Sequence, residues 1–170
     1  MEKPKTKNVK LTFSRENLLY DIGNYAYIQG DAMPTADAQA AQKIIDLTQE
    51  GNIDRITRIL DLAHAECVDM LYPYTKIECE NEEERIDDLV ESSEYVITLA
   101  VPEDFSTTTI NFLAKLIHEY LVYYVMADWL TLTYPAMSTI WQEKLMSVAK
   151  DIKTRLNTRC GRVRRTQTPF

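Results

Sequence analysis

Glycine is scarce in this chain, and its spacing excludes the phosphate-binding loops that depend on it. The 170 residues contain four glycines, at positions 23, 30, 51 and 161. A P-loop or a dinucleotide-binding fingerprint needs several glycines within a few residues of one another. Nucleotide binding through a glycine-rich loop is therefore excluded.

Cysteine and histidine are also scarce. The three cysteines, Cys67, Cys79 and Cys160, are odd in number and far apart, which argues against a disulfide framework and for a reducing compartment. His64 and Cys67 have the spacing of one helix face, but no second pair of ligands completes a four-ligand metal site. We therefore expect no metal and no other cofactor, and we expect His64 and Cys67 to form a small polar patch beside the core.

Recognisable catalytic motifs are missing as well. His118 is followed by Glu119 but lacks the second histidine of an H-E-x-x-H helix, and no G-x-S-x-G sequence occurs. We expect a protein that is not an enzyme. An enzyme that uses His64, Cys67 or His118 is the third and least favoured hypothesis.

Long apolar runs are absent. The longest, Tyr120–Ala127, has eight residues, whereas a membrane-spanning helix needs about 20. The lysine-rich start of the chain is not followed by an apolar segment, so no secretory signal is expected. We therefore expect no membrane partner.

The composition is that of an ordinary globular protein, with 45% hydrophobic and 26% charged residues. A chain of 170 residues is long enough to bury one core. We predict a single helical domain over residues 11–158, between an N-terminal basic arm (1–10) and a C-terminal basic arm (159–170).

Apolar periodicity predicts a mainly α fold, a bundle of about five helices. The expected helices cover about residues 15–29, 36–50, 52–71, 106–133 and 137–158. The fourth helix is apolar nearly all round in its second half, which indicates the central buried helix. Gly51 is expected as the C-cap of the second helix, and Pro135 is expected to end the fourth.

Two short segments have the alternation of strands. Residues 9–13 predict a short strand, and residues 95–101 are rich in β-branched side chains and are bounded by Pro102. Residues 74–80 alternate weakly. We predict that 74–101 forms a small β-hairpin-like excursion from the helical body, with an acidic link between its strands.

The charge is unevenly distributed along a chain whose formal net charge is −7. Overall attraction to nucleic acid or to anionic membranes is not expected at this net charge. The first residues are basic, with Lys3, Lys5 and Lys7, whereas the stretch 78–94 is acidic. Its acidic side chains include Glu78, Glu80, Glu82, Glu83, Glu84, Asp87 and Asp88. This stretch is either a solvated loop or a docking patch for a basic arm.

The chain ends in an arginine-rich tail with no acidic residue after Asp151. Its candidate docking residues are Arg155, Arg159, Arg162, Arg164, Arg165 and the terminal Phe170. Three interpretations stay open: a disordered solubilising end, a grip on phosphates, or docking on an acidic protein surface. No aromatic residue lies between the arginines, which disfavours stacking on single-stranded nucleic acid. The apolar anchor at Phe170 favours docking on protein.

Several features of the last third of the chain form a recognisable pattern. They are Leu121-Val122-Tyr123-Tyr124-Val125 leading to Asp128-Trp129-Leu130, the Tyr134-Pro135 break, Trp141-Gln142-Glu143-Lys144, and the arginine-rich tail. With them, the segment 105–165 resembles the C-terminal part of small neck proteins of tailed bacteriophages, the head–tail connector or adaptor class. The resemblance implies a mainly helical, non-enzymatic protein that forms rings, commonly twelvefold, beneath the portal. It also implies terminal arms that grip neighbouring proteins.

The leading hypothesis is therefore a virion structural protein, the protomer of a ring that connects the capsid portal to the tail. It would assemble in the host cytoplasm and reside at the capsid–tail junction. Its partners would be other copies of itself, portal and tail or neck proteins, and transiently the packaged DNA. The alternative hypothesis is a small intracellular interaction or regulatory protein that uses its arginine-rich tail on nucleic acid.

Overall fold

The computed structural model describes residues 5–76 and 92–158. Its elements in chain order are β1 (Thr6–Ser14), α1 (Arg15–Asp31), α2 (Ala38–Ile45), α3 (Glu50–Met70), β2 (Glu94–Pro102), α5 (Thr107–Thr133) and α6 (Pro135–Thr158). Short 3₁₀ turns, Thr35–Asp37 and Asp46–Thr48, flank α2. The prediction of a mainly helical protein with five helices and a small two-stranded sheet is confirmed.

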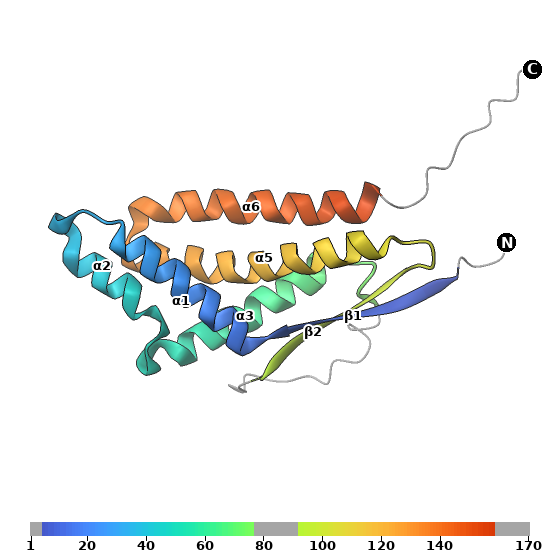
Figure 1. Ribbon diagram of the computed structural model, residues 1–170, viewed down its shortest axis with the longest axis horizontal. Helices are drawn as coiled ribbons and strands as arrows, with labels where there is room; N and C mark the ends of the chain where they lie inside the picture. The colour runs from blue at the N-terminus through green and yellow to red at the C-terminus, as the bar shows by residue number, and fades with distance from the viewer. Residues whose placement is uncertain (1–4, 77–91, 159–170) are drawn as a thin grey trace, which may run out of the picture.

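Helix α5 is the centre of the molecule. In Figure 1 it runs between α6 on one side and α1 and α3 on the other. Leu113, Ile117, Leu121 and Val125 recur every four residues and are completely buried. A helix that is apolar nearly all round must be covered on several sides, so the predicted central position follows from its composition.

The helices around α5 each bury one stripe. On α1 the buried residues are Leu18, Ile22, Ala26 and Gly30, spaced four apart. On α3 the buried residues run from Ile56 to Val68. Helix α6 packs mainly on α5 and buries Trp141, Ile152 and Leu156. The covering helices are therefore amphipathic, as their period indicates.

The two strands pair antiparallel with each other, from Thr6 opposite Pro102 to Ser14 opposite Glu94. The predicted strand at 95–101 is confirmed as part of β2. Its partner in the described residues is β1; of the predicted partner, 74–80, residues 74–76 are not in a strand, and the rest lies outside the described residues. Alternate residues of both strands face the core, for example Leu11 and Ile97.

Residues at the end of α3 are held in turns instead of a strand. The buried Thr75 hydroxyl donates a hydrogen bond to the Val68 carbonyl at 2.7 Å. One backbone bond still links this region to β2, from the Ala100 N–H to the Tyr74 carbonyl at 2.8 Å. The rest of the predicted excursion, 77–91, lies outside the described residues.

Three boundaries differ from the sequence predictions. Gly51, expected as a C-cap, lies in the first turn of α3, whose N-cap is Gln49. The fourth helix, α5, ends at Thr133 before Pro135 as expected, but α6 begins at Pro135 and not at 137, a position where the missing N–H costs no hydrogen bond. Strand β1 begins at Thr6, so half of the segment predicted as an N-terminal arm (1–10) belongs to the sheet.

None of the helices within residues 5–76 and 92–158 combines the length and the hydropathy that a membrane crossing requires.

Two glycines in helices allow a matched test of this packing. A Cβ atom on Gly30 would lie 2.5 Å from Cγ1 of Ile45 and 3.0 Å from the Ala41 carbonyl oxygen, whereas a Cβ atom on Gly51 would meet nothing within 4 Å. We expect Gly30→Ala to destabilise the protein by about 1–3 kcal/mol through overpacking. Gly51→Ala should instead stabilise it by up to about 1 kcal/mol, because alanine favours the helix.

Urea denaturation followed by circular dichroism measures both free energies of unfolding. A Gly30→Ala protein as stable as the parent would contradict the close packing of α1 on α2.

Candidate functional site

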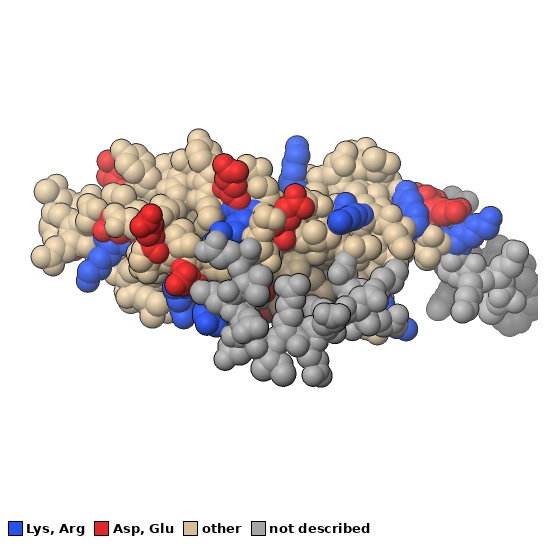
Figure 2. Space-filling view, turned by 90° about the horizontal axis from the view of Figure 1, so that it is seen from below, with Lys and Arg blue, Asp and Glu red and all other residues tan. Residues whose placement is uncertain are grey.

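The predicted basic segments join the helical body at the same end of the molecule. The start of β1 and the C-terminal end of α6 both lie there (Figure 1). Lys5 and Lys7 belong to the first of these, and Lys150, Lys153 and Arg155 to the second. Lys and Arg side chains also gather at this end in Figure 2, with an acidic side chain between them. We call this region the basic end.

Lys7 of the basic end is engaged inside the fold. Its Nζ donates hydrogen bonds to the carbonyl oxygens of Phe105, at 2.9 Å, and of Glu103, at 3.1 Å. The N–H of Glu103 in turn donates to the Lys5 carbonyl at 3.3 Å. These bonds attach the start of β1 to the loop that precedes α5, so the ammonium group of Lys7 serves as an anchor.

Arg155 has a comparable position at the end of α6. Its guanidinium lies 5.1 Å from the centre of the Phe112 ring, a cation–π contact that joins α6 to the first turns of α5. The other predicted docking residues lie outside the described residues: Lys3, Arg159, Arg162, Arg164, Arg165 and Phe170, and the acidic Glu78, Glu80, Glu82, Glu83, Glu84, Asp87 and Asp88.

A groove that the sequence did not reveal lies between α3 and α6. It has a volume of about 540 Å³ and is lined by Ala65, Glu66, Asp69 and Met70 of α3, Tyr120 of α5, and Ala149 and Lys153 of α6. A second hollow of about 590 Å³ shares Ala149 and Lys153, and its other described lining residues, Met146, Lys150, Thr154 and Asn157, also belong to α6. We call the two hollows together the α3–α6 groove, although among the described residues only the first has a wall from α3.

Two tyrosines of α5, of which Tyr120 lines the α3–α6 groove, contact one carboxylate. The hydroxyl of Tyr124 donates to Oε1 of Glu66 at 2.9 Å, and the hydroxyl of Tyr120 donates to Oε2 at 3.5 Å. Burial, followed by the hydrogen bond and the charge of Glu66, raises the pKa of Tyr124 to about 12. Burial and the charge of Glu66 also raise the pKa of Tyr120. Both phenols therefore remain protonated donors at neutral pH.

Sequence reasoning missed this groove although a partial signal exists. Tyr120 and Tyr124 are four residues apart, as are Glu66 and Met70, so each pair occupies one helix face. Nothing in the spacing says that the two faces meet.

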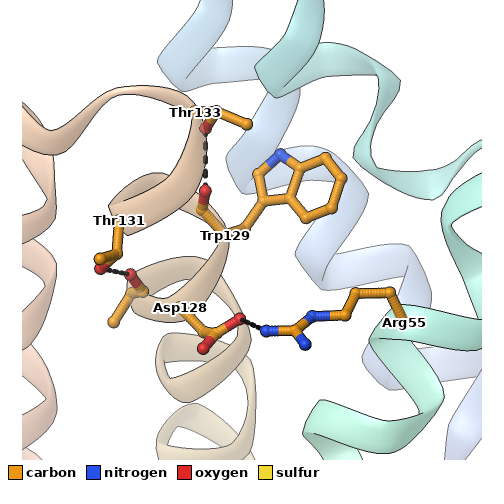
Figure 3. A network of polar contacts seen from close by, with 6 residues as sticks. Arg55, Asp128, Trp129, Thr131 and Thr133 are labelled. Atoms are coloured by element: carbon orange, nitrogen blue, oxygen red, sulfur yellow. Dashed lines mark hydrogen bonds and ion pairs between the residues drawn. The ribbon is translucent and has the colours of Figure 1, made fainter.

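The Asp128-Trp129 pair, part of the pattern that resembles neck proteins, makes internal contacts. Asp128 forms an ion pair with Arg55 of α3 at 2.8 Å (Figure 3). The indole N–H of Trp129 donates to the Lys43 carbonyl at 3.2 Å. The hydroxyls of Thr131 and Thr133 donate to carbonyls one turn back in α5. These contacts fix α5 against α2 and α3.

Trp141, another residue of that pattern, joins α6 to α1 and α5. Its ring packs edge-on against Tyr25 and Tyr123, with centroids 5.4 and 5.5 Å away, and its N–H donates to Gln29 at 3.3 Å. The ammonium group of Lys144 lies 4.3 Å from the Trp141 ring centre. This aromatic cluster stabilises the packing of α6.

The histidines and Cys67 have separate surroundings. The Nε2 atom of His64 lies 2.9 Å from the Val96 carbonyl oxygen, and Nε2 of His118 lies 2.7 Å from Oδ2 of Asp21. Cys67 is fully buried, and burial raises the pKa of its thiol to about 12. Across the described ranges, no three His, Cys, Asp or Glu side chains are grouped so that they could hold a metal ion.

Comparisons with known proteins give no match to this chain, whether with protein-family models, curated proteins or solved structures. The functional conclusion therefore depends on the described side chains. Among these, the basic end and the α3–α6 groove are two regions where exposed charged groups lie beside a surface that a partner could occupy.

The state of Cys67 gives a direct test of the enzyme hypothesis. In a Cys79→Ser, Cys160→Ser variant, Cys67 is the sole thiol, and we expect it to react with an aromatic disulfide reagent only when the protein unfolds. The reason is that its sulfur is buried and protonated at neutral pH. Labelling rates with and without denaturant measure this, and fast labelling of the native protein would contradict it.

The tyrosine–Glu66 contact predicts an alkaline titration. We expect Glu66→Gln to lower the pKa of Tyr124 from about 12, because it removes a negative charge beside the phenol. Burial remains, so the pKa should stay above its ordinary value. An ultraviolet absorbance titration, compared with a Tyr124→Phe variant, measures the shift, with the exposed Glu16→Gln on α1 as the control.

The same raised pKa values determine the direction of a stability change. The folded protein keeps phenolic protons that the unfolded chain loses above about pH 10. The free energy of unfolding should therefore fall as the pH rises through this range. In the titration, a pKa of Tyr124 that does not change in the Glu66→Gln variant would contradict the contact between Tyr124 and Glu66.

Proposed function

We propose that this protein is a non-enzymatic structural component of a tailed-phage virion, and that its copies form a ring between the capsid portal and the tail. The observation that carries the proposal is the basic end, where both basic segments join a packed helical body. The resemblance of residues 105–165 to neck proteins supplies the assembly class.

The arrangement suits a protein that assembles through its ends. A ring needs a heterologous interface, in which one surface of each copy binds a different surface of the next. Chain ends that leave one pole of a rigid body can reach a neighbouring copy or the portal in one fixed direction. Several weak contacts made by such ends add up, because the first contact raises the effective concentration for the second.

The second candidate, a regulatory protein that binds nucleic acid through its tail, is favoured by the same gathering of Lys and Arg at the basic end. It makes a different prediction about salt, because the release of counterions weakens phosphate binding steeply as salt rises. Filter binding of single- and double-stranded DNA over a range of salt concentrations distinguishes the two candidates.

Truncation tests the proposed assembly. A chain that ends at Thr158 retains every helix that the structure describes, and we expect it to fold but to form no rings, alone or with portal protein. Deletion of residues 1–4 removes nothing from β1 and serves as the matched control, in which we expect weaker effects. Native mass spectrometry and negative-stain imaging in the presence of portal protein measure assembly, and circular dichroism reports folding.

Two outcomes would refute the proposal. One is a full-length protein that remains strictly monomeric and ignores portal and tail proteins. The other is ring formation that is identical with and without residues 159–170.

A further inference from the structure

We propose that the α3–α6 groove binds the arginine-rich C-terminal segment, residues 159–170, of a neighbouring copy. The inference rests on the proposed assembly and names the surface through which one copy holds the next. The proposed ring and the proposed binding to portal both stand beside this contact.

The chemistry of the groove suits guanidinium groups. Glu66 and Asp69 are exposed on one wall, and a carboxylate binds arginine through two parallel hydrogen bonds. The rings of Tyr120 and Tyr124, with centroids 6.1 Å apart, lie beside the Glu66 carboxylate. A tyrosine face next to an acid provides both the cation–π and the ionic contact that arginine makes.

The same chain already uses both contacts elsewhere. Arg55 pairs with Asp128 at 2.8 Å, and Arg155 lies over Phe112 at 5.1 Å. Arginine against acid and arginine against an aromatic ring are thus contacts that this fold makes at its surface, and the groove offers a site where one segment can make both.

The groove also has apolar surface for the other residues of the segment. Met146 is 64% exposed, and Ala65, Met70 and Ala149 line the groove beside it. The segment carries Val163 between its arginines and ends in Pro169-Phe170. Burial of these side chains would add about 25 cal/mol per Å² of apolar area, which a purely charged tail could not gain.

The segment is long enough for the groove. It has 12 residues, and an extended chain of that length spans at most about 40 Å. The groove follows α6 from Met146 to Asn157, a length of helix of about 18 Å. One extended segment can therefore follow the groove and place its apolar terminus beyond the acidic wall.

The charges of the α6 wall favour the segment of another copy. Lys150 and Lys153 border the groove on α6, so a tail that folded back along its own α6 would run beside both ammonium groups. A tail from a neighbouring copy can enter from the α3 side, where Asp69 lies. Like-charge contacts disfavour the first path, whereas opposite charges favour the second.

Cys160 in the tail makes the contact measurable in the full-length protein. On a Cys79→Ser background, we introduce Ala65→Cys, an exposed position in the groove wall, and treat the assembled protein with a short bismaleimide. The matched control is Ala136→Cys, an exposed alanine in the first turn of α6. We expect a cross-link between residues 65 and 160 and none between 136 and 160.

Mixed isotope labels identify the donor of the tail. When ¹⁴N and ¹⁵N proteins are mixed before assembly, a tail from a neighbouring copy gives cross-linked peptides of mixed label, whereas a tail on its own body gives only unmixed ones. We expect mixed peptides. Unmixed peptides alone, no cross-link, or an equal yield at Ala136→Cys would overturn the proposal.

Charge reversal tests the acidic wall. We expect Glu66→Lys with Asp69→Lys to lower the cross-link yield by about tenfold or more, as the loss of one side of an interfacial charge pair does. Asp54→Lys, an exposed change near the start of α3, should leave the yield unchanged. When Arg162→Glu and Arg164→Glu are added in the tail of the Glu66→Lys, Asp69→Lys protein, the cross-link yield should be restored.

The result is separable from that of the proposed function. Rings that form without the 65–160 cross-link overturn this inference and leave the ring proposal standing. A protein that forms no oligomer under any condition overturns both, and imaging tells the two outcomes apart.

Discussion

The rest of the structure depends on the burial of α5. Fully buried aliphatic side chains such as Ile117, Leu121 and Val122 each contribute about 1.5–3 kcal/mol when removed from water, and they lie on more than one side of the helix. Helices α1, α3 and α6 cover most of α5. Between α3 and α6, tyrosines occupy the surface of α5, and their hydroxyls reach Glu66. The α3–α6 groove is thus a consequence of how α5 is covered.

The sequence could predict what depends on local spacing and could not predict what depends on distant pairing. The period of Ile56, Leu60 and Ala63 is sufficient to place α3. The partner of β2 is distant in the chain, and both candidate partners alternate, so only the tertiary packing of Leu11 against the core selects β1. The groove escaped prediction for the same reason, because neither of its walls carries a motif.

The side chains behind the resemblance to neck proteins have a structural use in this fold. Asp128 pairs with Arg55, the Trp129 indole binds a carbonyl of α2, and the Trp141 ring packs on Tyr25. A sequence pattern made of such contacts reflects how α5 and α6 pack against the other helices. Two proteins can share this pattern without binding the same partner. The case for assembly therefore depends on the basic end more than on the pattern itself.

At the basic end, charge and geometry have separate roles. Lys7 and Arg155 belong to the basic segments, yet each makes an internal contact, with the Phe105 carbonyl and with the Phe112 ring. These contacts fix the start of β1 and the end of α6, the points at which the segments join the body. Positive charge alone would attract an acidic partner without orienting it. Because the points where the segments join the body are fixed, less conformational freedom is lost on binding, and this loss is a main cost of association. A ring, in which every copy must bind the next at the same angle, is the kind of assembly that benefits most from such fixed attachment points.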